Sequence, residues 1–204
     1  MKKESMERAA ESFKIEAEEL SRIPEYLNLS AFEAAADAVV SAGRVVTCAS
    51  GSSGIAAKKF AHTLCCIEKS AQFLPPCEAV HGGLGALKPG DLLVMVSRGG
   101  KTSELLPVAA ACRKRKAKLL LLTEQADSPL ARYADLLLLM KIGRESDKFN
   151  YMATSSFVVT IALFDALIAA VMEETDYRRE QFADIHPGGA VGEMLEGERH
   201  DKKA

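Results

Sequence analysis

Apolar residues in the first forty positions recur at intervals of three and four, which is typical of amphipathic helices. One such pattern runs from Met6 to Leu20, and a second runs from Phe32 to Val40 with Ser30 as a candidate N-cap. The chain is therefore predicted to open with two helices.

After Gly43 the pattern changes to short continuous apolar runs, which are typical of strands buried on both faces. The runs are Val45–Cys48, Ala71–Leu74, Leu92–Val96, Leu119–Leu122 and Leu136–Met140. Helical patterns are seen at 55–67, 103–115, 128–133, 153–174 and Arg178–Ile185. Because strands and helices alternate, the sequence predicts an α/β fold: a parallel sheet with helices on both faces.

The chain shows no internal repeat, low-complexity tract or linker, and 204 residues suit one domain. We expect a helical arm at 1–42 that packs on a domain at 43–196, followed by a polar tail at 197–204. The tail contains only polar and small residues after Gly197 and is expected to fray.

Net charge and composition limit the classes of molecule that this chain is expected to bind. A formal net charge of -2 argues against nucleic acid or an anionic membrane as the main partner, since both usually select a basic face. The N-terminus lacks the apolar segment of a signal peptide, and the longest apolar stretch, Phe157–Met172, is short for a membrane span and contains Asp165. We therefore expect a cytoplasmic protein that acts on small molecules or binds other proteins.

Cysteine and histidine usage agrees with that compartment. An odd number of cysteines, without a C-x-x-C pair and with apolar neighbours, predicts reduced, buried thiols. They are Cys48, Cys65, Cys66, Cys77 and Cys112. The histidines are His62, His81, His186 and His200, and their spacing matches no metal-ligand motif. We expect neither a metal nor a cofactor.

Two turns rich in glycine and hydroxyl residues follow predicted strands. The first, Ala49–Gly54, nearly matches the dinucleotide motif G-x-G-x-x-G, but it begins with Ala49, and no acidic residue ends the second strand. The second, Ser97–Ser103, ends like a nucleotide-binding loop, but Met95 stands where that loop needs its first glycine. Neither turn therefore predicts a bound nucleotide.

Both turns bring hydroxyls and backbone N–H groups to a helix N-terminus at the carboxyl end of a strand, where an anion is favoured. A phosphomonoester would fit between them. The candidate phosphate-binding residues are Ser50, Gly51, Ser52, Ser53, Ser97, Gly99, Gly100, Lys101, Thr102 and Ser103. The alternative is that these residues only form tight turns and helix caps.

Five motifs together resemble the sugar isomerase (SIS) domain, and in particular its arabinose-5-phosphate isomerase branch, from about Gly43 to Gly192. They are A-S-G-S-S-G, E-A-V-H-G-G-L-G, S-R-G-G-K-T-S-E-L, A-T-S-S and F-A-D-I-H-P-G-G-A-V-G. The segment His186–Ala190 is the most specific. The resemblance implies a five-stranded parallel sheet that binds a sugar phosphate through Ser97, Thr102, Ser103 and the 50–54 loop.

The resemblance also implies an aldose–ketose isomerase, which must move a proton between C1 and C2 through an enediolate. Glu104, Glu145, His81 and His186 match the family's acid and base positions. Each has an alternative explanation. Glu104 could be a first-turn helix acid, Glu145 could pair with Arg144 or Lys148, His81 could be a turn residue, and His186 could cap a helix.

The chain departs from the family at the phosphate loops. Ser52 stands where the family usually has lysine, and the second loop carries Gly99 and Lys101, where Lys101 could restore the lost charge. The family's paired CBS modules are expected to be missing, since only a short tail follows Leu195. These departures leave the sugar undetermined.

Two functions remain open: an isomerase and a non-catalytic phosphosugar sensor. The isomerase is preferred because both glutamates and both histidines are present and the N-terminal helices lack a basic DNA-binding face. The resemblance further implies that His186 reaches a neighbouring subunit's pocket. The apolar 153–172 segment and the apolar stripes of the N-terminal helices independently favour self-association, and the alternative is that all of them pack inside one subunit. We expect a homodimer or a homotetramer.

Overall fold

The computed structural model describes residues 1–188, 192 and 194. Its N-terminal part contains α1 (Lys3–Ser21), the short α2 (Ile23–Tyr26) and α3 (Leu29–Ser41), so the two predicted N-terminal helices are confirmed. The N-cap of α3 is Asn28 and not Ser30, because the Ala31 amide donates to Asn28 Oδ1 at 2.9 Å.

Five parallel strands form one sheet in the order β2-β1-β3-β4-β5. Their bounds are β1 Val45–Cys48, β2 Ala71–Phe73, β3 Leu92–Val96, β4 Lys118–Thr123 and β5 Leu136–Leu139. The predicted all-parallel α/β fold is confirmed. All strands end at one edge of the sheet, so the turns after β1 and β3 are neighbours there.

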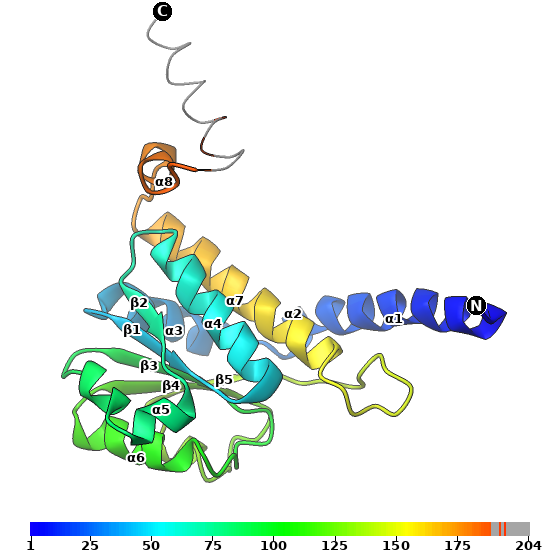
Figure 1. Cartoon of the computed structure of the whole chain (residues 1–204), viewed down its shortest axis with the longest axis horizontal. Coiled ribbons are helices and arrows are strands. Elements are labelled where there is room, and N and C mark those ends of the chain that lie inside the picture. The colour runs from blue at the N-terminus through cyan, green and yellow to red at the C-terminus, as the bar shows by residue number, and fades with distance from the viewer. Residues whose placement is uncertain (189–191, 193, 195–204) are drawn as a thin grey trace, which may run out of the picture.

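Helices cover both faces of the sheet (Figure 1). One face carries α3, α4 (Gly51–Cys65) and α7 (Ser155–Glu174), and the other carries α5 (Pro76–Val80) and α6 (Leu106–Lys114). The chain also contains α8 (Arg179–Ile185) and the 3-10 turns η1 (Gly83–Ala86) and η2 (Ala131–Tyr133).

Two sequence expectations need correction here. The helix predicted at 128–133 is only η2, because Pro129 interrupts the segment and the Leu130 amide donates to the Gly100 carbonyl at 3.0 Å. The short helix α5 was not predicted, since its five residues are too few for a periodic pattern.

The core lies in two layers because side chains alternate along each strand. Val94 and Leu120 pack towards α4 and α7, whereas Leu93 and Leu121 pack towards α6. Between α4 and α7 the rings of Phe60 and Phe164 stack with centroids 4.2 Å apart.

The helix α7 is long and apolar enough, by length and composition, to cross a membrane, but 50% of its most apolar window is buried inside the protein. Its Asp165 forms an ion pair with Lys59 of α4. In this structure α7 is a core helix.

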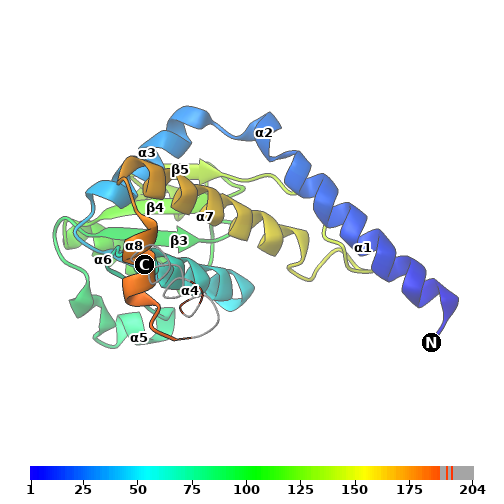
Figure 2. The ribbon, with the colours of Figure 1, turned by 90° about the horizontal axis from the view of Figure 1, so that it is seen from above.

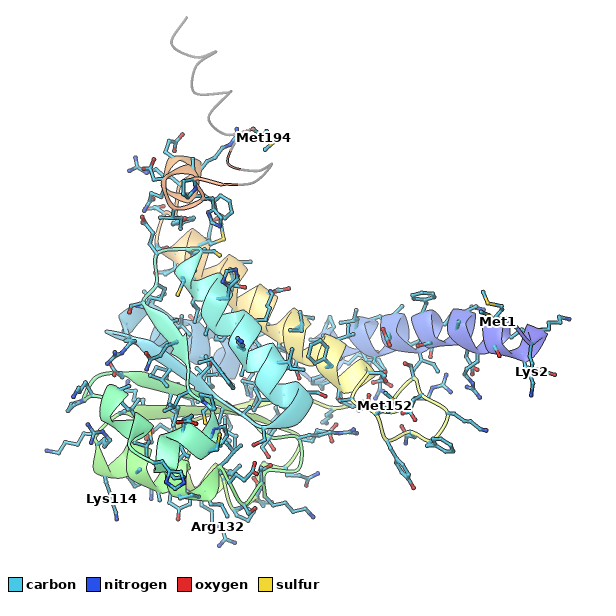
Figure 3. All side chains as sticks on the ribbon, in the orientation of Figure 1. Met1, Lys2, Lys114, Arg132, Met152 and Met194 are labelled. Carbon is cyan, nitrogen blue, oxygen red and sulfur yellow. The ribbon has the colours of Figure 1, made fainter. Side chains whose placement is uncertain are left out.

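The helix α1 projects away from the sheet (Figures 1 and 2). Only its second half contacts the domain: Ile15 and Glu19 are buried, whereas every residue up to Ala10 is exposed. Figure 3 shows Met1 and Lys2 at the far tip of this arm.

The five cysteines are all free, but the prediction that they are buried is wrong for three of them. Cys65 and Cys77 are exposed and Cys66 is partly exposed, because they occupy helix ends. Cys48 and Cys112 are buried, and burial is the main cause that raises the pKa of each thiol to about 12. Of the expected features, Gly189, Ala190 and the polar tail 197–204 lie outside the described residues.

Candidate functional site

The loop after β3 folds around its own hydroxyl groups. Ser97 is buried at the strand end, and its Oγ lies 2.9 Å from Thr102 Oγ1. The Gly100 amide donates to the Ser97 carbonyl at 3.0 Å, which closes a tight turn. Lys101 and Ser103 are exposed beside this turn. The predicted phosphate loop therefore presents hydroxyl and ammonium groups at the carboxyl edge of the sheet.

The backbone conformation and the close packing at position 100 both require glycine. The φ of Gly100 is +61°, and a Cβ placed there would lie 2.0 Å from Ser128 Oγ. The loop after β3 thus packs tightly on the segment after β4, and any side chain at position 100 would force the two apart.

The turn after β1 leads directly into α4, which begins at Gly51. The predicted 50–54 loop is therefore mostly the first turn of a helix, with Ser50 as its N-cap residue. Ser50 makes no side-chain cap bond among the described residues; its Oγ instead donates to Glu104 Oε2 at 2.6 Å. The first amides of α4 are left to face an anion, because the first turn of a helix leaves its N–H groups without partners inside the helix.

The sequence suggested that Glu104 starts a helix, but the structure shows that it does not. It lies in a turn, and α6 begins at Leu106 with Pro107 in its first turn. The Ser50–Glu104 hydrogen bond joins the turns after β1 and β3, so the two predicted loops do meet.

An open pocket of about 480 Å³ lies against this junction. Ser50, Lys58 and Glu104 supply its polar side chains, and the N-terminal half of α4, the end of β2 and α5 form most of the rest. The other lining residues are Ala49, Gly51, Gly54, Ile55, Phe73, Pro75, Pro76, Cys77, Val80 and Pro107. The exposed carboxylate of Glu104 therefore faces a cavity large enough for a small phosphorylated sugar.

Glu145 has a different environment, in the loop between β5 and α7. The residue is 2% exposed, and Oε1 accepts from Arg98 Nη1 at 2.7 Å. Oε2 accepts from the Thr154 amide at 2.9 Å, the Ser156 amide at 3.0 Å and Thr154 Oγ1 at 3.1 Å. Glu145 thus caps the N-terminus of α7 and pairs with Arg98, and not with Arg144 or Lys148, which were the partners considered in the alternative explanation.

The pKa of Glu145 lies below its ordinary value. Burial alone would raise this pKa, but the hydrogen bonds from Ser156 and Thr154 stabilise the charged carboxylate and outweigh burial. Arg98 also donates from Nε to Glu124 Oε2 at 2.8 Å. Arg98 therefore holds two carboxylates next to the phosphate loop.

The two candidate histidines lie in unlike places. His81 ends α5, directly after the pocket residue Val80, and is exposed. His186 ends α8, stacks on Phe182 and forms a 2.8 Å hydrogen bond between its Nδ1 and the Phe182 carbonyl.

The α8 segment lies beside the C-terminal end of α4, where two hydrogen bonds hold it. Tyr177 Oη donates to the Cys66 carbonyl at 2.9 Å, and Gln181 Nε2 donates to Glu68 Oε2 at 2.6 Å. Glu104 lies at the opposite end of α4, which is 15 residues long. At 1.5 Å per residue, roughly 20 Å separates His186 from Glu104 within one chain.

Comparison with known proteins agrees with the fold. The SIS domain pattern matches residues 39–170. The chain belongs to the SIS domain family.

Among curated SIS relatives, the arabinose 5-phosphate isomerase GutQ of Salmonella typhi is 35% identical over 181 residues, covering 89% of this chain and 56% of the relative. The arabinose 5-phosphate isomerase KdsD of Pseudomonas aeruginosa is 37% identical over 153 residues, covering 75% of this chain and 47% of the relative. The chain thus spans about half the length of the curated relatives it matches.

Two solved structures cover nearly the whole SIS chain. A Listeria monocytogenes protein proposed to be a sugar-phosphate isomerase is 38% identical, with a TM-score of 0.88, and the match covers 92% of this chain and 100% of that one. An Escherichia coli CFT073 protein, solved in complex with a sugar phosphate, is 27% identical with a TM-score of 0.86 and the same coverage.

Sequence reasoning missed Arg98 as a site residue, although it lies inside the S-R-G-G motif. A cation directly before two loop glycines was the available signal. It also did not assign Thr154 and Ser156 to the site, although both lie inside the A-T-S-S motif, because their contacts with Glu145 depend on how the loop before α7 folds.

Proposed function

We propose that this chain isomerises an aldose phosphate to the corresponding ketose phosphate. The observation that carries the proposal is the Ser50–Glu104 contact, because it joins the turns after β1 and β3 and the exposed Glu104 carboxylate lines the pocket. The names of the curated relatives support an arabinose 5-phosphate or a related substrate.

In this proposal Ser97, Thr102, Ser103 and Lys101 bind the phosphate together with the first amides of α4, including those of Ser52 and Ser53. The remaining proposed phosphate contacts are Ser50, Gly51, Gly99 and Gly100. A phosphate held at this edge directs the carbonyl end of the sugar towards the pocket.

Glu104 is the strongest candidate for moving the proton between C1 and C2, since it is exposed to the pocket. Glu145 is the second candidate, although its oxygens are occupied by Arg98 and by the start of α7. In this proposal His81, which directly follows the pocket residue Val80, shuttles hydroxyl protons or assists ring opening. The reaction uses acid–base groups and requires no metal or cofactor.

We further propose that His186 acts on the pocket of a second subunit in a homodimer or homotetramer. Its distance from Glu104 within one chain supports this arrangement. Mixing His186→Ala protein with Glu104→Gln protein under subunit exchange should restore activity. A fully active monomer would exclude this role for His186.

The test of the function is a panel of pentose and hexose phosphates assayed for exchange of the C2 proton with solvent. We expect exchange with at least one aldose phosphate, and loss of exchange in Glu104→Gln. Binding without exchange across the whole panel would reject the isomerase and favour a phosphosugar sensor. The free cysteines support a cytoplasmic location for either function.

A further inference from the structure

The pocket beside Glu104 contains a second charged side chain, Lys58. Within the part of the chain that the structure describes, these two are the charged residues that line the pocket, and most of the other lining residues are apolar. The proposed mechanism gives a task to Glu104 but none to Lys58. A lysine in this cavity therefore adds a chemical group that the proton transfer alone does not explain.

Lys58 lies on the face of α4 that borders the pocket. Three other lining residues precede it by seven, four and three positions and therefore share this face; they are Gly51, Gly54 and Ile55. Helical side chains lean towards the N-terminus of their helix, and Gly54 lies about 6 Å closer to that end than Lys58. Neither glycine has a side chain that would block the flexible four-carbon stem of the lysine. The ammonium group can therefore reach towards the start of α4, where Glu104 lies.

The charge of Lys58 is not used by the fold. The residue is exposed, and among the described residues it has no hydrogen bond or ion pair. The neighbouring Lys59 differs, because it pairs with Asp165 of α7, which packs on another face of α4. Lys101 also lies elsewhere, since none of the described residues 97–103 lines the pocket. Lys58 is therefore the cation available where the sugar carbons are proposed to lie.

We propose that Lys58 is a further catalytic residue, which stabilises the enediolate through hydrogen bonds from its ammonium group to O1 and O2. This role rests on the proposed isomerase function. When Glu104 takes the C2 proton, the C–H electron pair forms a C1=C2 double bond and the carbonyl electron pair moves onto O1. A cation next to O1 stabilises this negative charge, and it does so more strongly in a mostly apolar cavity than in water.

The same ammonium group serves the second half of the reaction. The hydroxyl proton on O2 moves to O1, so the negative charge passes to O2. Glu104 then returns its proton to C1, and the ketose carbonyl forms at C2. Lys58 stays protonated throughout, and its three N–H donors can follow the charge from one oxygen to the other. Lys58 therefore lowers the barrier without accepting a proton.

The first test removes the charge of Lys58 in the full chain. Lys58→Met keeps an unbranched side chain of similar length, and the rate of C2 exchange should fall about 10²-fold. Lys58→Arg keeps the charge and should recover part of this loss. Lys59→Met is the matched control and should exchange at the wild-type rate, because Lys59 does not line the pocket. Wild-type exchange in Lys58→Met would overturn the proposal, and so would an equal loss in Lys59→Met.

The second test separates this role from phosphate binding and from the isomerase itself. The probes are arabinitol 5-phosphate, which has no carbonyl group, and the hydroxamate of 5-phosphoarabinonic acid, which resembles the planar, anionic enediolate. Calorimetry should show that Lys58→Met binds the hydroxamate at least about tenfold more weakly than wild type does, with arabinitol 5-phosphate nearly unaffected. An equal effect on both probes, or none on either, would overturn the role of Lys58. Wild-type protein that does not prefer the hydroxamate and exchanges no C2 proton would instead reject the isomerase, and with it this role.

Discussion

Replacing Glu145 with glutamine is expected to destabilise the fold, because this carboxylate holds the β5–α7 loop, α7 and Arg98 together. The change keeps the shape of the side chain and removes its charge. Oε2 loses a charge-assisted bond to each of the Thr154 and Ser156 amides, and Oε1 loses its ion pair with Arg98. Each of these interactions is stronger with a carboxylate than with an amide.

The size of the effect follows from burial. Removing one partner of a buried ion pair costs about 3–5 kcal/mol. The Arg98 side chain is 40% exposed and can be partly rehydrated, and the glutamine oxygen can still accept a backbone bond. We therefore expect a loss of about 2–3 kcal/mol in the free energy of unfolding. For a chain of this length that corresponds to a fall in Tm of roughly 4–12 °C.

Thermal denaturation at neutral pH measures this loss, with Glu104→Gln as the matched control. Glu104 is exposed, and its side chain forms a hydrogen bond to Ser50 at the surface, so the Tm of Glu104→Gln should stay within about 1 °C of wild type. An unchanged Tm in Glu145→Gln would refute the assignment of Glu145 as a structural clamp.

The pH dependence gives a second check on Glu145. Its pKa in the folded protein lies below the ordinary value of 4.5, so its contribution to stability is present above that value. The contribution is lost as the pH falls through the depressed folded pKa. The Tm difference between wild type and Glu145→Gln should therefore be full at pH 7 and shrink below pH 4.5. A difference that stays constant at low pH would contradict this reasoning.

Three further predictions concern activity. Glu104→Gln should lower kcat about 10²-fold or more, with KM nearly unchanged in steady-state assays. If Glu104→Gln and Glu145→Gln both exchange the C2 proton at the wild-type rate, neither residue takes part in the mechanism. Lys101→Ala should raise KM about tenfold with a smaller effect on kcat, and an unchanged KM would show that Lys101 does not contact the phosphate. Activity should survive exhaustive chelation, whereas full loss with recovery on adding one metal would disprove the metal-free mechanism.

The sheet could be predicted from the sequence because parallel strands buried on both faces are continuous apolar runs. The runs Val45–Cys48 and Leu92–Val96 match β1 and β3 residue for residue. The helix at 128–133 was mispredicted because a tertiary contact, Leu130 with Gly100, decides that segment. Local periodicity contains no information about such a contact.

The candidate site also contains one part that could be predicted from the sequence and another that could not. The Ser97–Ser103 loop was predictable, because its hydroxyls and glycines are adjacent in sequence and its strand ends at a known edge. The Arg98–Glu145 pair was not predictable, since the two residues are 47 positions apart and meet only through the sheet order β3-β4-β5. The role of Glu19 in binding the Gly143 amide depends in turn on where α1 crosses the β5–α7 loop.

The β5–α7 loop is held from two sides, and these contacts connect α1 to the loop that carries Glu145. On one side Glu145 is bound by Arg98 and the start of α7. On the other side Glu19 binds the Gly143 amide, and Glu16 binds Ser146. The folded arm therefore favours the ordered loop, because these hydrogen bonds join α1 to the residues on either side of Glu145.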